Sequence, residues 1–306
     1  MFMASIEAPD LWLQDFCERH RLPDSYTTMA LRYLLPEADK LAAKATTTRP
    51  LLVGINGCQG SGKSTLAALL TEYLTAHHQQ VVANLSIDDF YLTKVQRLTL
   101  AADRHPLFVT RGVPGTHDVT LLQQTLDKLR KPSGTVAIPR FDKAVDDRHP
   151  ESQWDKLDTP VDVILLEGWC VGVTPQGDAD LINPVNVLEA GEDSDGLWRQ
   201  WVNQCIETNY QPLFRQIDHL LLLAAPSFDC VYQWRQKQEA KLRDQRQHQQ
   251  STATSGIMDD QALSRFIQHY QRLTEHMLRV LPQRANTVFT LNALHQITGS
   301  KFPQGD

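Results

Sequence analysis

The 306-residue sequence has few cysteines, no long apolar run and no excess of positive charge. Its five cysteines are widely spaced and form no CxxC pair, which argues against a disulfide framework or a zinc site and favours a reducing compartment. The longest apolar run, Leu220 to Ala225, is too short to cross a bilayer. The first ten residues lack the basic start and apolar stretch of a secretory signal. We therefore expect a soluble cytoplasmic protein with no membrane partner.

The charge balance is mildly acidic, with 30 basic and 36 acidic residues and a net charge of -6. Such a balance disfavours general binding to nucleic-acid backbones, so we expect no nucleic-acid partner. Any phosphate chemistry then requires a local basic site. The length and the 42% of hydrophobic residues suffice for one large α/β domain with additions, or for two small domains.

The apolar pattern changes near residue 50. Residues 10–20 and 27–45 have helix-like apolar spacing, and they predict an N-terminal helical extension. Short apolar runs then alternate with helical patterns, which predicts a mainly parallel sheet covered on both faces. The expected strands are 51–55, 81–87, 161–166, 220–223 and 287–291, and the expected helices are 64–77, 118–131, 196–217, 227–247 and 259–281.

The most specific motif is GCQGSGKS at residues 57–64, which matches GxxxxGK[ST] between an expected strand and an expected helix. Glycines let consecutive N–H groups turn toward one anion, and the helix start adds the positive end of its dipole. Lys63 is expected to contact the β- and γ-phosphates of ATP, and Ser64 to be a ligand of Mg²⁺. Cys58 either makes the loop sensitive to thiol reagents or is a small filler. The expected ATP-binding residues are Gly57, Cys58, Gln59, Gly60, Ser61, Gly62, Lys63, Ser64 and Thr65.

Acidic residues follow two of the expected strands, at the sheet edge where α/β proteins bind ligands. Transfer of phosphate to an alcohol needs a carboxylate that orients the hydroxyl and accepts its proton, and Asp88 is our candidate. Asp89 is expected to point elsewhere, either toward a substrate or as a helix cap. The alternative interpretation of both Asp88 and Asp89 is that they are helix caps or surface residues. Glu167 is expected to hold Mg²⁺ directly or through water, with a structurally paired buried acid as the alternative.

Two loops supply candidate acceptor-binding residues. RGVPGTHD at 111–118 is a shaped loop with several donors and acceptors, although Asp118 is also a candidate cap for the next helix. PRFDK at 139–143 brings a second arginine, and arginine is suited to a bidentate grip on a carboxylate. Solvated loop charge is the alternative interpretation. The proposed substrate-binding residues are Asp89, Tyr91, Arg111, His117, Arg140 and Asp142.

The expected helix from residue 227 carries charges of both signs, which is typical of a solvated face. The alternative is a lid over about 227–256 that brings Arg235 and Lys241 over the transferring phosphate and excludes water. The polar stretch 245–256 has too few apolar residues to predict a packed element.

Five segments of the sequence resemble the D-glycerate 3-kinase family, within the P-loop kinases related to uridine kinase, phosphoribulokinase and pantothenate kinase. They are SIDDFYLT at 86–93, RGVPGTHD at 111–118, IPRFDK at 138–143, LLEGWCVG at 165–172 and WRQKQEAKLR at 234–243, and the resemblance covers roughly residues 50–295.

The resemblance implies a three-layer α/β/α nucleoside-triphosphate-hydrolase fold that uses Mg·ATP. The chain would then comprise an N-terminal helical extension, residues 1–49, and a P-loop kinase domain, residues 50–306. The resemblance also matches Asp88 to the family's base and favours the lid for Arg235. The expected activity is phosphorylation of a small acceptor, with D-glycerate first. A nucleoside or pantothenate kinase and a regulatory ATPase without acceptor remain alternatives.

Overall fold

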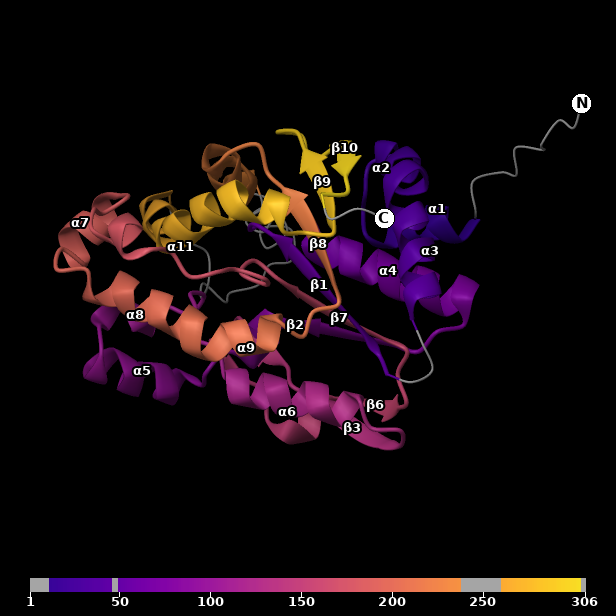
Figure 1. The fold of residues 1–306 in the computed structure, drawn as a ribbon, viewed down its shortest axis with the longest axis horizontal. Coiled ribbons are helices and arrows are strands. Elements are labelled where there is room, and N and C mark those ends of the chain that lie inside the picture. Colours follow the sequence, from indigo (N-terminus) through magenta and orange to yellow (C-terminus); the bar gives the residue numbers. More distant parts are fainter. Residues whose placement is uncertain (1–10, 46–48, 238–259, 304–306) are drawn as a thin grey trace, which may run out of the picture.

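The centre of the structure is a six-stranded sheet with the order β10-β9-β8-β1-β7-β2. The computed structural model describes residues 11–45, 49–237 and 260–303 (Figure 1). β10 runs antiparallel to β9, and the other neighbouring pairs are parallel. The strands are β1 (Leu51–Gly57), β2 (Val82–Ser86), β7 (Val163–Gly168), β8 (His219–Ala224), β9 (Thr287–Leu291) and β10 (Ile297–Lys301).

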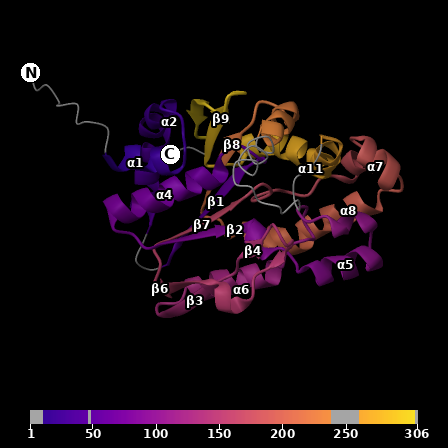
Figure 2. The ribbon, with the colours of Figure 1, turned by 180° about the vertical axis from the view of Figure 1, so that it is seen from behind.

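Helices cover both faces of this sheet, because side chains along β1 alternate between two apolar cores. Val53 and Ile55 lie in one core with α1, α3 and α4, whereas Leu52 lies in the other with α6, α8, α9 and α11. Figure 1 and the reverse view in Figure 2 show the sheet between these layers. The expected three-layer α/β/α fold with a mainly parallel sheet is confirmed. The covering helices are α1 (Leu11–Arg19), α3 (Leu35–Lys44), α4 (Lys63–His78), α6 (Val119–Leu129), α8 (Leu197–Cys205), α9 (Gln211–Phe214) and α11 (Asp260–Val280).

The helix expected at 196–217 was predicted too long and too regular. A π-helix, η6 (Ile206–Tyr210), separates α8 from α9, and α9 ends at Phe214. Pro212 lacks the N–H that an α-helix needs, and a wider π turn directly before it accommodates the missing donor. The N-terminal helices contain the same arrangement, since the π-helix η1 (Ala30–Leu34) follows α2 (Ser25–Met29) and precedes Pro36.

Several small elements were not predicted, because their sequences are polar and lack a regular apolar period. Two two-stranded ribbons lie beside the main sheet, β3 with β6 and β4 with β5. These additional elements are α5 (Lys94–Asp103), α7 (Val187–Glu192), β3 (Gly134–Ile138), β4 (Phe141–Asp142), β5 (Asp147–Arg148), β6 (Asp155–Thr159), η2 (Ile87–Phe90), η3 (Pro106–Val109), η4 (Glu151–Gln153), η5 (Asp178–Leu181) and η7 (Leu281–Gln283).

The N-terminal helices are fixed to the sheet by a buried polar contact as well as by the shared core. Glu37 of α3 accepts hydrogen bonds from His219 Nε2, at 2.8 Å, and from Thr287 Oγ1, at 2.7 Å. Those two residues begin β8 and β9. Burial opposes ionisation of Glu37, but the contacts with His219 and Thr287 outweigh it and hold the pKa of this carboxyl below its usual value. The boundary proposed near residue 49 stays a prediction, although both parts contribute to one core.

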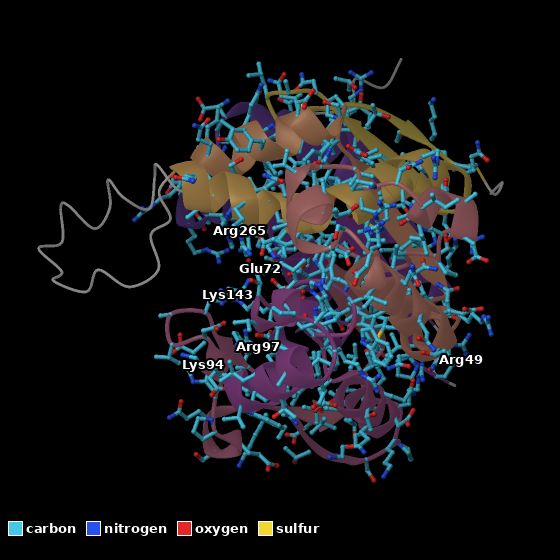
Figure 3. All side chains as sticks on the ribbon, turned by 90° about the vertical axis from the view of Figure 1, so that its left-hand side faces the viewer. Arg49, Glu72, Lys94, Arg97, Lys143 and Arg265 are labelled. Carbon is cyan, nitrogen blue, oxygen red and sulfur yellow. The ribbon has the colours of Figure 1, made fainter. Side chains whose placement is uncertain are left out.

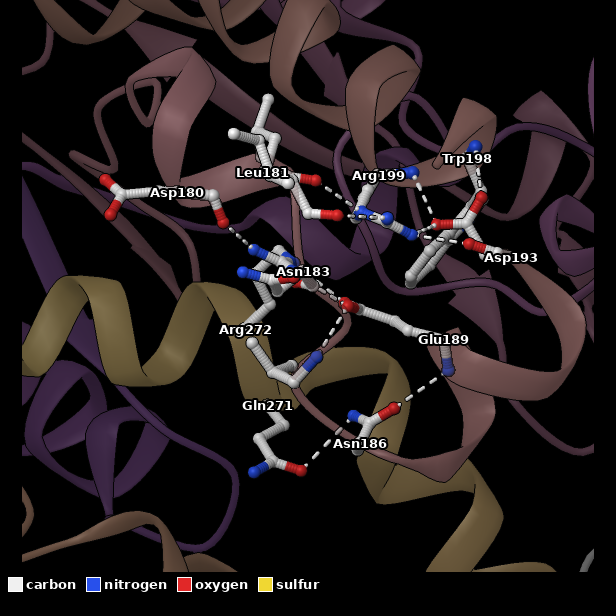
Figure 4. A network of polar contacts seen from close by, with 12 residues as sticks. Asp180, Leu181, Asn183, Asn186, Glu189, Asp193, Trp198, Arg199, Gln271 and Arg272 are labelled. Atoms are coloured by element: carbon white, nitrogen blue, oxygen red, sulfur yellow. Dashed lines mark hydrogen bonds and ion pairs between the residues drawn. The ribbon is translucent and has the colours of Figure 1, made fainter. Parts of the chain in front are cut away.

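A buried network of charges joins α11 to the long segment between β7 and α8 (Figure 4). Arg272 contacts Glu189 through Nη2 at 2.6 Å and also donates to the carbonyl groups of Asp180 and Asn183. Arg199 pairs with Asp193 at 2.8 Å, and all four charged side chains are almost fully buried. Asp193 also accepts from the N–H of Trp198 at 2.7 Å, so it satisfies a donor in the first turn of α8, whose N-cap residue is Gly196.

We expect Arg272→Met to lower the free energy of unfolding by about 3–5 kcal/mol, because it leaves Glu189 buried without its charge partner. Arg265→Met is the matched control, since Arg265 lies on the same helix and pairs with Glu192 at 2.7 Å where both side chains are nearly half exposed. That loss should be within about 1 kcal/mol. Chemical denaturation of the three proteins measures both values. Equal destabilisation by the two variants would contradict the view that the buried Arg272–Glu189 pair contributes more to stability than the exposed Arg265–Glu192 pair.

Candidate active site

The loop between β1 and α4 has the backbone conformation that its sequence predicts. Gly60 and Gly62 have φ of 78° and 91°, in the left-handed region that favours glycine. Gly62 is the residue directly before α4, so the first N–H groups of this helix face the concave side of the loop. A Cβ at Gly60 would come within 2.9 Å of Trp234 Cβ, so the helical residues 228–237 pack closely against the loop.

Lys63 and Ser64 meet Glu167 at the start of α4. Ser64 Oγ donates to Glu167 Oε1 at 2.9 Å, and Lys63 Nζ lies 4.0 Å from Glu167 Oε2. Glu167 lies in β7, opposite Ile55 of β1, and only 6% of it is exposed. Its Oε2 has no hydrogen-bond partner among the described residues.

This donor set fits Mg²⁺. A hydroxyl and a carboxylate with a free buried oxygen are oxygen ligands of the kind that Mg²⁺ prefers, and the ion usually completes its shell with phosphates and water. Within the described residues, no group of three or more His, Cys, Asp or Glu side chains could hold a metal by itself. Ser64 and Glu167 remain the proposed metal ligands.

Asp88 lies two residues beyond Ser86, the residue of β2 that pairs with Glu167. Its carboxylate is partly buried and fixed on both sides, since Oδ1 accepts from Tyr91 Oη at 2.8 Å and Oδ2 contacts Lys143 Nζ at 2.7 Å. Burial alone would raise the pKa of Asp88, but the positive charges of Lys143 and Lys63 outweigh it and hold this pKa well below its usual value. Asp88 is therefore an ionised carboxylate beside the phosphate-binding loop.

Asp89 points away from Asp88, as expected, but it is not a helix cap. It accepts from Arg140 Nη1 at 2.9 Å and from the N–H of Phe141 at 3.1 Å. Burial is the main reason that the pKa of Asp89 is raised, although Arg140 opposes this effect. Asp142 accepts from the N–H groups of Ala144 and Val145, so it stabilises the turn of its own hairpin.

The loop at 111–118 lies against aromatic side chains. Trp169 Nε1 donates to the carbonyl of Gly112 at 2.9 Å, and Tyr270 Oη donates to the carbonyl of Arg111 at 3.1 Å. The Arg111 guanidinium forms an ion pair with Asp146. Asp118 accepts from the N–H of Leu121 at 2.9 Å, which confirms that it caps α6.

His117 is buried between two tyrosines. Its ring stacks on Tyr91 with centroids 4.5 Å apart, and its Nδ1 contacts Tyr210 Oη at 2.8 Å. Burial lowers the pKa of His117 to about 4, although the charge of Asp88 opposes this shift. The ring is therefore neutral at neutral pH. Its Nε2 is buried and has no hydrogen-bond partner among the described residues, which leaves one polar atom for a ligand.

The remaining predicted site residues, Arg140, Arg235 and Lys241, do not form one cluster in the described structure. Arg140 bridges Asp89 and the exposed Asp155. Arg235 lies with its guanidinium 5.9 Å from the centre of the Phe266 ring, next to α11. Lys241 and the polar stretch 245–256 lie outside the described residues, so the proposed lid remains a prediction.

Sequence reasoning missed the roles of Lys143 and Tyr210. Lys143 stands in the IPRFDK segment that was singled out, but its contact with Asp88 depends on the unpredicted β4–β5 hairpin. Its side chain is 60% exposed, and it lies on the face of the molecule that Figure 3 shows. Tyr210 comes from the π-helix η6, which no periodicity in the sequence indicates.

Cys58 is a buried filler of the loop. Burial raises the pKa of its thiol to about 12, although the charge of Lys63 opposes this shift. The reactive thiolate is therefore scarce at neutral pH, which disfavours the alternative of a thiol-sensitive loop. All five cysteines are free and buried.

The fold and the site together define a P-loop kinase, which uses ATP and phosphorylates a small molecule. The chain belongs to the phosphoribulokinase and uridine kinase family, which residues 52–183 match. It is 38% identical over 230 residues to "Uncharacterized kinase mug58" of Schizosaccharomyces pombe, covering 72% of this chain and 79% of that protein.

Two further relatives carry a more specific name. The chain is 30% identical to "D-glycerate 3-kinase, chloroplastic" of Arabidopsis thaliana over 72% of its own length, but it spans only 46% of that protein. A solved D-glycerate 3-kinase from Cryptococcus neoformans superposes with a TM-score of 0.67 at 25% identity, covering 88% of this chain and 96% of the other.

Within the described residues, every helix is too short or too polar to span a bilayer.

Proposed function

We propose that this protein transfers the γ-phosphate of Mg·ATP to a hydroxyl group of D-glycerate or a closely similar small acid, and that it does so in the cytoplasm. The observation that carries the proposal is the ionised Asp88 beside Lys63, Ser64 and Glu167. The names of the Arabidopsis and Cryptococcus relatives support glycerate as the acceptor.

In this reaction the acceptor oxygen bonds to the γ-phosphorus, the bond to the β-phosphate oxygen breaks, and ADP leaves. Asp88 orients the hydroxyl group and accepts its proton. Lys63 and the N–H groups at the start of α4 stabilise the negative charge on the phosphates. Ser64 and Glu167 would hold Mg²⁺, which when bound supplies further charge neutralisation.

The acceptor carboxylate would be bound by arginines that already face carboxylates. Arg140 contacts Asp155, whose side chain is 64% exposed, and a substrate carboxylate can replace this weak surface partner. Arg111 and the free Nε2 of the neutral His117 would complete the acceptor site. The other predicted residues would act through their neighbours. Asp89 would position Arg140, Tyr91 would position Asp88, and Asp142 would stabilise the hairpin.

The test is a phosphorylation assay in which D-glycerate, uridine, pantothenate and ribulose 5-phosphate are supplied one at a time, with one reaction that has no acceptor. ADP release and the mass of the product are measured in each reaction. ADP release that requires D-glycerate, with a product heavier by one phosphate, is the expected result. Release that requires uridine or pantothenate would support another kinase of the family. Release without any acceptor would support the regulatory ATPase.

The pH dependence of this reaction should report on Lys143. Because Lys143 and Lys63 lower the pKa of Asp88, the base stays ionised in mild acid, and it should not limit kcat/KM above about pH 5. In Lys143→Met the largest lowering contribution is gone, so the acidic limb of the profile should move to higher pH. An unchanged limb would contradict the assignment of Asp88 as the base. The measurement is kcat/KM for the acceptor between about pH 3 and about pH 9, a range that includes the ordinary carboxyl pKa values of about 4.

A further inference from the structure

A chain of buried polar contacts runs from the loop at 111–118 through Tyr210 to the ring of His117. Tyr210 ends the π-helix η6, and only 1% of it is exposed. Its hydroxyl oxygen lies 3.0 Å from the backbone nitrogen of Gly115 and 2.8 Å from Nδ1 of His117. Single π turns inside helices recur at functional sites. This π turn places a hydroxyl group against the histidine of the proposed acceptor site.

The two contacts of Tyr210 decide which nitrogen of His117 carries the proton. The N–H of Gly115 can only donate, so the Tyr210 oxygen accepts from it. Burial raises the pKa of Tyr210 well above its usual value, although the N–H groups of Gly115 and His117 oppose this shift, so the hydroxyl group keeps its own hydrogen. The acceptor within reach of that hydrogen is Nδ1 of His117. Tyr210 therefore donates to Nδ1, and the neutral ring carries its proton on Nε2.

The opposite tautomer of His117 would leave more groups unpaired. A proton on Nδ1 would point at the Tyr210 oxygen, and the hydroxyl hydrogen would then lack an acceptor among the described residues. Nε2 would in addition be a buried acceptor without a donor. Each buried polar group without a partner costs free energy. With the proton on Nε2, the Nε2–H alone stays unpaired within this set of contacts.

The unpaired Nε2–H belongs to a ring that lies beside the proposed base. Tyr91 joins the two, because its ring stacks on His117 and its hydroxyl group donates to Asp88 Oδ1 at 2.8 Å. Burial lowers the pKa of His117, and the charge of Asp88 is near enough to oppose this shift. A molecule whose hydroxyl group is oriented by Asp88 would thus lie next to this ring. One of its oxygen atoms, placed against Nε2, would satisfy a buried donor that the protein itself leaves unpaired.

From these contacts we propose that Tyr210 is a positioning residue that holds His117 as a neutral Nε2–H donor, and that this donor selects an acceptor molecule with an oxygen lone pair at that point. The carboxylate and hydroxyl oxygens of a small hydroxy acid have such lone pairs, whereas an ammonium group has none. This inference rests on the proposed function, because it places the acceptor molecule next to Asp88.

The first measurement is the tautomer itself. Long-range proton–nitrogen correlation spectra of the full chain distinguish the two tautomers of a neutral histidine, and the signals that disappear in His117→Gln assign this ring. We expect the Nε2–H form in the wild type and a mixture of tautomers in Tyr210→Phe, which removes the hydroxyl group and keeps the aromatic ring. A wild-type ring with its proton on Nδ1 would overturn the inference.

Tyr270→Phe is the matched control for these spectra. Tyr270 is also buried, and its hydroxyl group donates to the carbonyl of Arg111 in the same loop rather than to His117. Tyr270→Phe should therefore leave the tautomer as it is in the wild type. The same mixture of tautomers in both variants would show that loosening of the loop, and not loss of the Tyr210 hydroxyl group, controls the ring.

The second measurement is steady-state kinetics with D-glycerate. Tyr210→Phe should raise the KM for D-glycerate about tenfold, which corresponds to the loss of one hydrogen bond to a charged oxygen. It should change kcat less and leave the KM for ATP unchanged, because the contact concerns binding of the acceptor. An unchanged KM for D-glycerate would overturn the inference.

The His117→Gln background separates this role from a structural role of Tyr210. A glutamine side chain can offer an N–H near the position of Nε2, but it has no tautomer for Tyr210 to fix. We therefore expect Tyr210→Phe to change the KM for D-glycerate little in this background. An equal rise with and without His117→Gln would overturn the inference. A wild-type protein that phosphorylates no small hydroxy acid would refute the proposed function and the selection by Nε2–H with it, even where the spectra show the expected tautomer.

Discussion

Asp88→Asn should lower kcat by about 10²–10⁴-fold, the range that removal of a general base typically costs, while the Kd for Mg·ATP stays nearly unchanged. The substitution keeps the shape of the side chain and its contact with Tyr91 Oη, but it removes the charge that accepts the proton. The pKa of Asp88 is held low by Lys143 and Lys63, so the wild-type group is ionised and ready to act. Steady-state kinetics with D-glycerate, the proposed acceptor, and calorimetry with ATP measure the two quantities.

The neighbouring acid provides the control. Asp89→Asn makes the same chemical change one residue away, but Asp89 faces Arg140 and Phe141 rather than the phosphate-binding loop. We therefore expect Asp89→Asn to raise the KM for the acceptor more than it lowers kcat. Near-normal turnover in Asp88→Asn, or equal effects of the two variants on kcat, would show that Asp88 is not the base.

The centre of the sheet could be predicted because β1, β7 and β8 are buried along nearly their whole length and read as short apolar runs. Leu51–Ile55 and Leu220–Leu223 are examples, and the glycine-rich motif then places the loop and α4. The β10 strand and the two ribbons could not be predicted in this way. Ile297–Lys301 and Asp155–Thr159 are largely exposed and polar, and they pair only because distant segments bring them together.

Asp88 and Glu167 could be proposed from sequence because the carboxyl ends of parallel strands meet at one edge of the sheet. Their partners could not. Lys143 reaches Asp88 across 55 positions of sequence through a four-residue hairpin turn, and Tyr210 reaches His117 from an irregular helix 93 positions away.

Lys63→Met should abolish measurable transfer, with a loss of about 10³-fold or more in kcat. Lys63 is the cation that begins α4, and removing such a charge from a phosphoryl-transfer site costs the stabilisation of the developing negative charge. Methionine keeps the apolar length of the side chain, and Ser64 still donates to Glu167. The fold should therefore survive, and thermal unfolding of the variant should resemble that of the wild type.

Lys94→Met is the matched control, because Lys94 is also a lysine at the first position of a helix, α5, and is exposed on the face shown in Figure 3. If the loss of a positive charge at a helix start lowered kcat in general, both variants would show it. The proposed role of Lys63 requires that kcat falls only in Lys63→Met. If Lys63→Met retained turnover comparable to Lys94→Met, the loop would not be the site of phosphate transfer. Because Lys63 also lowers the pKa of Asp88, its removal disturbs the base as well as the phosphate, so its effect on kcat should exceed that of Lys143→Met.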